Sequence, residues 1–178
     1  LPDPITKREM ILLIRQSFQQ YANIRPVRIW PGVPSPLSTD RLDDIDFICV
    51  RENSEGEYVD NGGRFSRDTS QDVAIQTAVH TRHGVERILR FGFEYARSRR
   101  NHLTMITKSN AQRYSFVLWD EILDQIKDEY PDVETTRQHC DAAVMNFVRC
   151  PEAFDVVVAS NLFGDLLTDL GGIIGGGL

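Results

Sequence analysis

The chain has 178 residues, of which 41% are hydrophobic, and a formal net charge of −6. This length can bury a core of one or two domains, and the acidic balance argues against a surface for nucleic acid. No apolar run reaches the roughly 18 residues that a membrane helix needs, and no signal peptide is visible. The three cysteines, at 49, 140 and 150, are scattered without a CxxC motif, so we expect reduced thiols in a cytoplasmic protein.

Hydrophobic periodicity predicts helices and strands in alternation along most of the chain. The first element is an amphipathic helix over residues 6–22, opened by a capping box of Thr6 and Glu9. A Pro-rich turn at 31–36, a polar loop or hairpin at 52–64 and a strand or arm at 71–80 interrupt the pattern. The remaining predictions are strands at 24–30, 45–50, 103–107, 133–138 and 154–160, and helices at 85–100, 114–129 and 142–149. This order indicates an α/β domain.

The last stretch, residues 154–170, reads as a buried Val-rich strand, a turn with Asn161 and Gly164, and a helix that opens near Asp165. Asp165 and Asp169 are four residues apart, so they share one helix face with Cβ atoms about 5–6 Å apart. Two carboxylates this close repel, and a hard divalent cation would relieve the repulsion. Spacing alone equally allows Asp165 to be an acid favoured by the helix dipole and Asp169 to be solvated.

Charged residues also stand where predicted strands end, which is where ligands collect in open α/β sheets. The residues that we place there are Arg25, Arg51, Lys108 and Asp165. Together with Arg15, Tyr58 and Asp141 they suit a metal-assisted reaction on a small polycarboxylate, because Arg binds carboxylates in a bidentate way.

Taken singly, each of these residues has an ordinary structural explanation. An arginine can be solvated, Tyr58 can anchor its loop, and Asp141 can be a helix N-cap. The histidines at 80, 83, 102 and 139 lack any metal-ligand spacing. The glycines at 171, 172 and 175 do not follow the GxGxxG order, so we expect a helix C-cap or hinge rather than a phosphate loop.

Five segments decide between these interpretations. They are IRQSFQQYANIRPVR, VRENSEGEY, TKSN, CDAAVMNFVR and VVASNLFGDLLTDLGG. In this order they resemble the β-decarboxylating dehydrogenases, the family of isocitrate, 3-isopropylmalate, tartrate and D-malate dehydrogenases, and most of all its tartrate/D-malate branch. The resemblance implies an isocitrate/isopropylmalate dehydrogenase-like α/β fold, in which 23–160 form the small dimerisation domain and 1–22 and 161–178 are edges of the large domain.

The resemblance also implies a reaction and its residues. Family members oxidise a 2-hydroxy acid with NAD or NADP and Mg²⁺ or Mn²⁺, usually with decarboxylation. The implied residues are Arg15, Arg25 and Arg51 for substrate carboxylates, Tyr58 and Lys108 for proton transfer, Asp141, Asp165 and Asp169 for the metal, and Asn110 beside the nicotinamide. Lys108 and Asp141 would complete the site of a partner subunit, so a homodimer is expected.

In the expected chemistry, Lys108 takes the hydroxyl proton after metal and Arg charges lower its pKa. Tyr58 then protonates the enol that remains when CO₂ leaves. The substrate would be tartrate or D-malate, the latter giving pyruvate and CO₂.

Two departures limit the comparison with the family. The dinucleotide loop of the family and its opening strand unit are absent from this sequence, which we interpret as a fragment without a full NAD site. Lys7 and Arg8 stand where the tartrate/D-malate branch has apolar and aromatic residues, which would favour a more polar or anionic substrate.

Other functions remain open from sequence. One is a non-catalytic dimerisation or regulatory subunit of the same fold, although the complete set of Arg, Tyr, Lys and Asp residues argues against it. Others are an isopropylmalate-type or isocitrate-type substrate, and a metal-dependent hydrolase or lyase unrelated to NAD.

Overall fold

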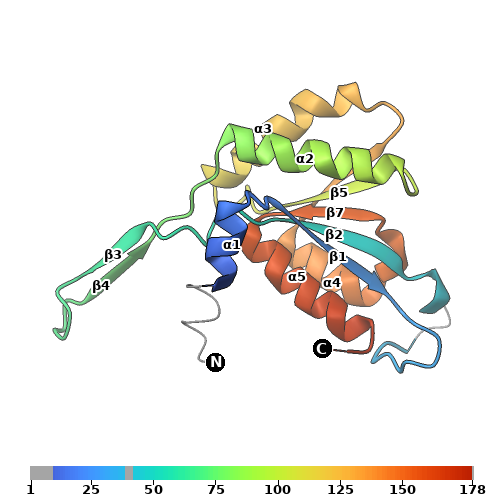
Figure 1. Ribbon diagram of the computed structural model, residues 1–178, viewed down its shortest axis with the longest axis horizontal. Coiled ribbons are helices and arrows are strands. Elements are labelled where there is room, and N and C mark those ends of the chain that lie inside the picture. Colours follow the sequence, from blue (N-terminus) through green and yellow to red (C-terminus); the bar gives the residue numbers. More distant parts are fainter. Residues whose placement is uncertain (1–9, 39–41, 178) are drawn as a thin grey trace.

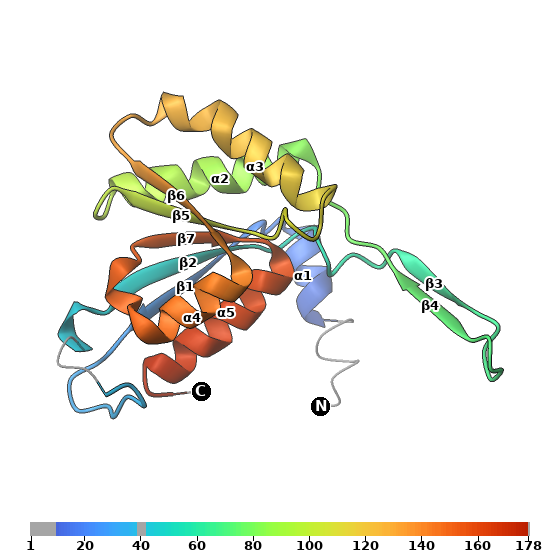
Figure 2. The ribbon, with the colours of Figure 1, turned by 180° about the vertical axis from the view of Figure 1, so that it is seen from behind.

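The computed structural model describes residues 10–38 and 42–177, and Figures 1 and 2 show it from opposite sides. The strands are β1 (Ala22–Arg28), β2 (Asp46–Glu52), β3 (Gly62–Phe65), β4 (Val73–Gln76), β5 (His102–Thr107), β6 (Glu134–His139) and β7 (Val156–Ala159). The α-helices are α1 (Leu12–Ser17), α2 (Arg82–Arg97), α3 (Ser115–Ile126), α4 (Cys140–Arg149) and α5 (Asn161–Ile174), and the short 3₁₀ helices are η2 (Leu42–Asp44), η3 (Lys127–Glu129) and η4 (Pro151–Ala153).

Five strands form one sheet in the order β1-β2-β7-β5-β6. Four strands run parallel to one another, namely β2, β7, β5 and β6. The edge strand β1 runs antiparallel to β2. The central strand β7 is buried along its whole length, as a Val-rich strand covered on both faces should be. This α/β arrangement confirms the predicted fold class.

Helices cover both faces of the sheet. In Figure 1, α2 and α3 lie above it, and α4 and α5 lie below it. Aromatic side chains fill the core beneath α4, where Phe47 packs against Phe147 and Phe154 with ring centroids 4.9 and 5.7 Å apart. On the other face Phe93 of α2 stacks on Tyr130, with centroids 4.3 Å apart.

The hairpin of β3 and β4 projects away from the sheet, as Figures 1 and 2 show. All eight of its strand residues are exposed, and they include Phe65, Val73 and Ile75. The prediction of an arm at 71–80 is therefore confirmed, with its partner strand supplied by the preceding polar segment.

The first predicted helix is wrong at its C-terminal end. α1 stops at Ser17, the chain turns at Gln19 with a φ of +48°, and β1 has already begun at Ala22. The apolar residues Ile14 and Phe18 are 45% and 74% exposed, so no described part of this chain covers that face. The proposed cap of Thr6 and Glu9, together with Lys7 and Arg8, lies outside the described residues.

Two helix starts also differ from prediction. α5 begins at Asn161, four residues before Asp165, because Ser160 caps it by accepting the N–H of Phe163. The N-cap of α4 is His139 rather than Asp141, which lies inside the first turn. The expected C-cap is confirmed, since Gly175 closes α5 and Gly176 follows at a φ of +88°.

The three cysteines are free, as predicted. Among the described residues no helix has both the length and the apolar character needed to cross a membrane.

Candidate active site

The carboxyl ends of β2, β7, β5 and β6 meet at one edge of the sheet because these strands are parallel. The loop after β2, the start of α5 after β7, Lys108 after β5 and the start of α4 after β6 all lie along this edge. Ligands bind at this edge in α/β sheets of this kind.

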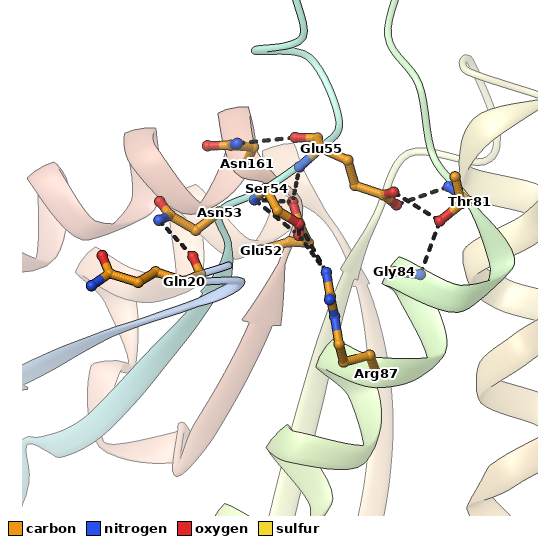
Figure 3. Close-up of polar contacts among 9 residues, drawn as sticks. All are labelled: Gln20, Glu52, Asn53, Ser54, Glu55, Thr81, Gly84, Arg87 and Asn161. Carbon is orange, nitrogen blue, oxygen red and sulfur yellow. Dashed lines mark hydrogen bonds and ion pairs between the residues drawn. The ribbon is translucent and has the colours of Figure 1, made fainter. Parts of the chain in front are cut away.

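Glu52, the last residue of β2, holds the loop that follows it. Its side chain is 1% exposed. Its carboxylate accepts the backbone N–H groups of Ser54 (3.0 Å) and Glu55 (2.8 Å). Arg87 of α2 donates to the hydroxyl of Ser54 at 2.9 Å, as Figure 3 shows. These bonds satisfy the buried carboxylate with local hydrogen-bond donors and so give the loop a fixed shape.

Arg51, the penultimate residue of β2, lies across the first turns of α5. Its Nε and one terminal nitrogen donate to Oδ1 of Asn161 at 3.0 and 2.7 Å, and its other terminal nitrogen donates to Asp165. The side chain of Arg51 is 4% exposed and that of Asp165 is 36% exposed. Gly164 makes this close approach possible, since a Cβ at that position would lie 2.6 Å from Cγ of Arg51.

Tyr58 completes this cluster. Its hydroxyl donates to Oδ2 of Asp165 at 2.6 Å. Partial burial, the bond to Asp165 and the negative charge of Asp165 raise the pKa of Tyr58 above its usual value. The phenol therefore keeps its proton at neutral pH, as a proton donor must.

Arg15 and Arg25 add positive charge beside this cluster. Burial lowers the pKa of Arg15, and the positive charges of Arg51 and Arg25 lower it further. Arg15 and Tyr58 line a cavity of about 110 Å³ together with Asn161. Clustered guanidinium groups repel one another, and a bound anion would relieve that repulsion.

Arg25 does not lie at a strand end, which corrects the sequence prediction. It is the fourth residue of β1 and pairs with Cys49 of β2. Its side chain points to the α5 side of the sheet, because it shares a strand face with Val27, which approaches Gly171 of α5. Arg25 thus reaches the same side as Arg51 from the middle of its strand.

Lys108 and Asp141 form a separate pair at the same edge. Nζ of Lys108 donates to Oδ1 of Asp141 at 2.8 Å. This bond raises the pKa of Lys108 and lowers the pKa of Asp141. The lowering of the Lys108 pKa expected from metal and Arg charges therefore does not occur in this single chain, where the neighbour of Lys108 is a carboxylate.

The three predicted metal ligands are not brought together by one chain. Asp165 and Asp169 lie one turn apart on α5, with Asp169 exposed, while Asp141 is bonded to Lys108 on α4. No three Asp, Glu, His or Cys side chains in the described ranges gather as a metal site. The oxygen donors of α5 fit Mg²⁺ or Mn²⁺, and each oxygen of Asp165 keeps a second lone pair beside its present hydrogen bond.

Asn110 lies in the exposed turn that follows β5, two residues beyond Lys108. An exposed amide can donate to and accept from a ribose or a carboxamide, so its chemistry fits a position beside a nicotinamide.

Sequence reasoning missed Asn161 and Glu57, which order this site, and Glu55, whose carboxylate orders the start of α2 instead. Asn161 was assigned only to a turn, yet it binds Arg51 through its oxygen and donates to the carbonyl of Glu55 at 2.9 Å. Glu55 and Glu57 were read as polar loop residues, but each bonds to the start of a helix. The sequence signal for Glu55 and Glu57 is that these two acidic residues flank Gly56 in the loop after β2.

Residues 2–178 match the sequence profile of the isocitrate/isopropylmalate dehydrogenase family. The chain belongs to that family. It is 51% identical over 172 residues to D-malate dehydrogenase (decarboxylating) of Escherichia coli (strain K12), and 47% identical over 173 residues to tartrate dehydrogenase/decarboxylase of Pseudomonas putida. Each alignment covers 96% of this chain but only 48% and 47% of those relatives.

The fold of this chain is also found in a solved structure. The isocitrate dehydrogenase from Methylococcus capsulatus superposes with a TM-score of 0.89 at 36% identity. That superposition covers 99% of this chain and 51% of the other. The chain thus spans about half the length of the relatives it matches.

Proposed function

We propose that this family member is a metal-dependent dehydrogenase that oxidises tartrate or D-malate with NAD and decarboxylates the 2-oxo product. The observation that carries the proposal is the contact of Arg51 and Tyr58 with one carboxylate, Asp165, next to Arg15. This cluster joins an anion-binding surface, a protonated phenol and a hard oxygen donor at the ligand-binding edge of the sheet.

The arginines account for the substrate class. Arg15, Arg25 and Arg51 lie on one side of the sheet, and their mutual repulsion favours a ligand with more than one carboxylate. The cavity of about 110 Å³ beside Arg15 and Tyr58 suits a small acid rather than a bulky one. The relatives named for tartrate and D-malate support this choice.

Mg²⁺ or Mn²⁺ at Asp165 and Asp169 would polarise the substrate oxygens, and NAD beside Asn110 would accept the hydride. The residues of this chain supply the proton transfers. Lys108 takes the proton of the substrate's 2-hydroxyl group. For this it must leave its bond to Asp141 and stand beside positive charges that lower its pKa. Tyr58 donates its hydroxyl proton to the carbon that has lost CO₂.

The separation of Lys108 and Asp141 from Asp165 supports shared sites in a homodimer, in which this pair completes the site of a partner. Exposed apolar residues of α4 and α5 support an interface beside the pair, namely Val144, Met145, Val148 and Leu166. Such residues mark protein interfaces when they gather on one face. The division into a small domain, 23–160, and edges of a large domain, 1–22 and 161–178, stays a prediction.

The test is reduction of NAD by the complete gene product with Mn²⁺ and, in turn, D-malate, tartrate, 3-isopropylmalate and isocitrate. We expect turnover with D-malate or tartrate, and its loss when a chelator removes the metal. Turnover with isocitrate or 3-isopropylmalate alone would overturn the substrate, and silence with all four would overturn the proposed activity.

A further inference from the structure

Glu57 links the loop after β2 to the start of α5. The hydroxyl of Ser160 donates to Oε1 of Glu57 at 2.8 Å, and the backbone N–H of Leu162 donates to Oε2 at 3.0 Å. The first N–H groups of a helix have no partner inside the helix, and the N-terminal end carries partial positive charge. The Glu57 carboxylate satisfies both needs.

The next residue along the loop is Tyr58, which binds the same helix one turn later. Its hydroxyl contacts Asp165, three residues beyond Leu162. Tyr58 is 42% exposed, so packing alone does not fix its ring. Two consecutive loop side chains thus contact α5 at two points, one turn apart.

A buried histidine lies behind Glu57. The indole N–H of Trp119 donates to Nδ1 of His80 at 3.0 Å, which leaves the imidazole proton on Nε2. That Nε2 lies 4.0 Å from Oε1 of Glu57, and it has no hydrogen-bond partner within the described part of the chain. The neighbouring Val79 exchanges two backbone hydrogen bonds with Gly56, at 2.7 and 3.0 Å. These two bonds hold the loop against the segment that follows β4.

We propose that Glu57 is a positioning residue that holds the first turn of α5 in register with the loop, so that Tyr58 and Asp165 meet. The role of Asp165 in metal binding rests on the proposed function, whereas the hold on α5 does not. Removal of the Glu57 carboxylate frees the start of α5, and Asp165 then binds metal less tightly because its helix is less ordered.

Glu55 provides a matched control in the same loop. Its carboxylate also binds the start of a helix, accepting the backbone N–H and the hydroxyl of Thr81 at 2.8 Å each, as Figure 3 shows. Thr81 is the N-cap of α2, which carries none of the proposed site residues. Glu55→Ala and Glu57→Ala therefore remove equivalent bonds from two helices, of which only α5 carries Asp165.

The experiment compares wild type with Glu57→Ala, Glu57→Gln and Glu55→Ala in the complete gene product. The first readout is amide hydrogen exchange. For Glu57→Ala we expect roughly fivefold faster exchange at residues 161–165 and no change at the start of α2, from the loss of a helix cap. Glu55→Ala should show the reverse. Glu57→Gln should restore slow exchange, because its amide can accept from Leu162 and donate to Ser160.

The second readout is Mn²⁺ affinity without substrate, measured by water-proton relaxation. Glu57→Ala should weaken it by roughly tenfold, as loss of a residue that orients a metal ligand does, and Glu55→Ala should not. Equal effects of both alanine variants on either readout would overturn the proposal, as would fast exchange at α5 with unchanged Mn²⁺ affinity. If the wild type binds no Mn²⁺, the proposed function fails, and the exchange contrast alone decides whether Glu57 positions α5.

Discussion

The Arg51 cluster and the Lys108 pair lie at the same edge of the sheet but differ in how the chain supports them. The side chain of Arg51 is 4% exposed and is bound by two residues of α5. In the Lys108 pair the side chain of Asp141 is 64% exposed, and Lys108 donates to its carboxylate from the neighbouring strand end. One chain therefore orders the first region by itself and leaves the second open to a neighbouring surface.

The two regions also differ in charge. Around Arg51, burial lowers the pKa of Arg15, and the positive charges of Arg51 and Arg25 lower it further. Lys108 and Asp141 neutralise each other, which raises one pKa and lowers the other. The first region is thus ready for an anionic ligand, whereas the second must exchange its partner before Lys108 can lose a proton.

The largest expected effect tests whether Tyr58 and Lys108 of one active site come from different subunits. Tyr58→Phe and Lys108→Met should each lower kcat by roughly 10²-fold or more, because each removes a proton-transfer group. If Lys108 serves the partner's site, a mixture of the two inactive proteins should regain about a quarter of wild-type activity. Half of randomly mixed dimers are hybrids, and each hybrid has one site with both residues intact.

Activity is measured after subunit exchange, which native mass spectrometry verifies. The matched control mixes each variant with itself under the same conditions. Hybrids that form without any recovery of activity would mean that Lys108 acts within its own chain.

A smaller effect tests how Arg51 is held. A Cβ at Gly164 would lie 2.6 Å from Cγ of Arg51, and one at Gly171 would lie 2.5 Å from Cγ2 of Val27. Both Gly→Ala changes overpack α5 against the sheet at a cost of about 1–3 kcal/mol, offset in part by about 1 kcal/mol of helix propensity. Only Gly164→Ala displaces a site residue, so we expect it alone to lower kcat/KM by roughly 10²-fold.

Urea unfolding gives the stability of both variants, and steady-state kinetics gives their activity. Gly171→Ala is the control for overpacking of the same helix. Equal losses of kcat/KM in the two variants would show that activity follows the packing of α5 in general rather than the position of Arg51.

The elements were predictable from sequence where local periodicity decides them. The strand expected at 103–107 is β5, His102–Thr107, and the arm is present as expected. The helix expected to open near Asp165 begins at Asn161, where Ser160 caps it and Glu57, more than a hundred residues away, binds its first turn. The Ser160 cap is a local signal in the sequence, whereas no local pattern can reveal the bond from Glu57.

The candidate site was predictable as residue types but not as contacts. The contact of Arg51 with Asp165 joins residues 114 apart in the chain, and it depends on Gly164, which leaves room for the Arg side chain. Arg25 was placed at a strand end because the start of β1 was set two residues too late. Its place is decided by pairing with β2, a tertiary contact.

The smallest expected effect is the pH dependence of the stability that the Lys108–Asp141 pair contributes. Asp141 has a pKa below its ordinary 3.8, and Lys108 has a pKa above its ordinary 10.5, because each hydrogen-bonds to the other. The stability that Asp141 contributes is present above pH 3.8 and is lost as the pH falls through its folded pKa. The stability that Lys108 contributes is present below pH 10.5 and is lost as the pH rises through its folded pKa. Wild type should therefore exceed Asp141→Asn in Tm by a small margin at neutral pH, and the margin should shrink as the pH falls below 3.8 toward the lowered pKa of Asp141.

Thermal melts of both proteins from pH 3 to pH 8 measure this margin, and added salt should reduce it because the pair is exposed. Arg137→Ala, which removes the exposed contact with Asp124 at 3.0 Å, is the control for a surface ion pair away from the Lys108 pair. If the Asp141 margin instead stays unchanged in acid and at high salt, the pair is not an open, solvent-screened contact and does not await a partner subunit.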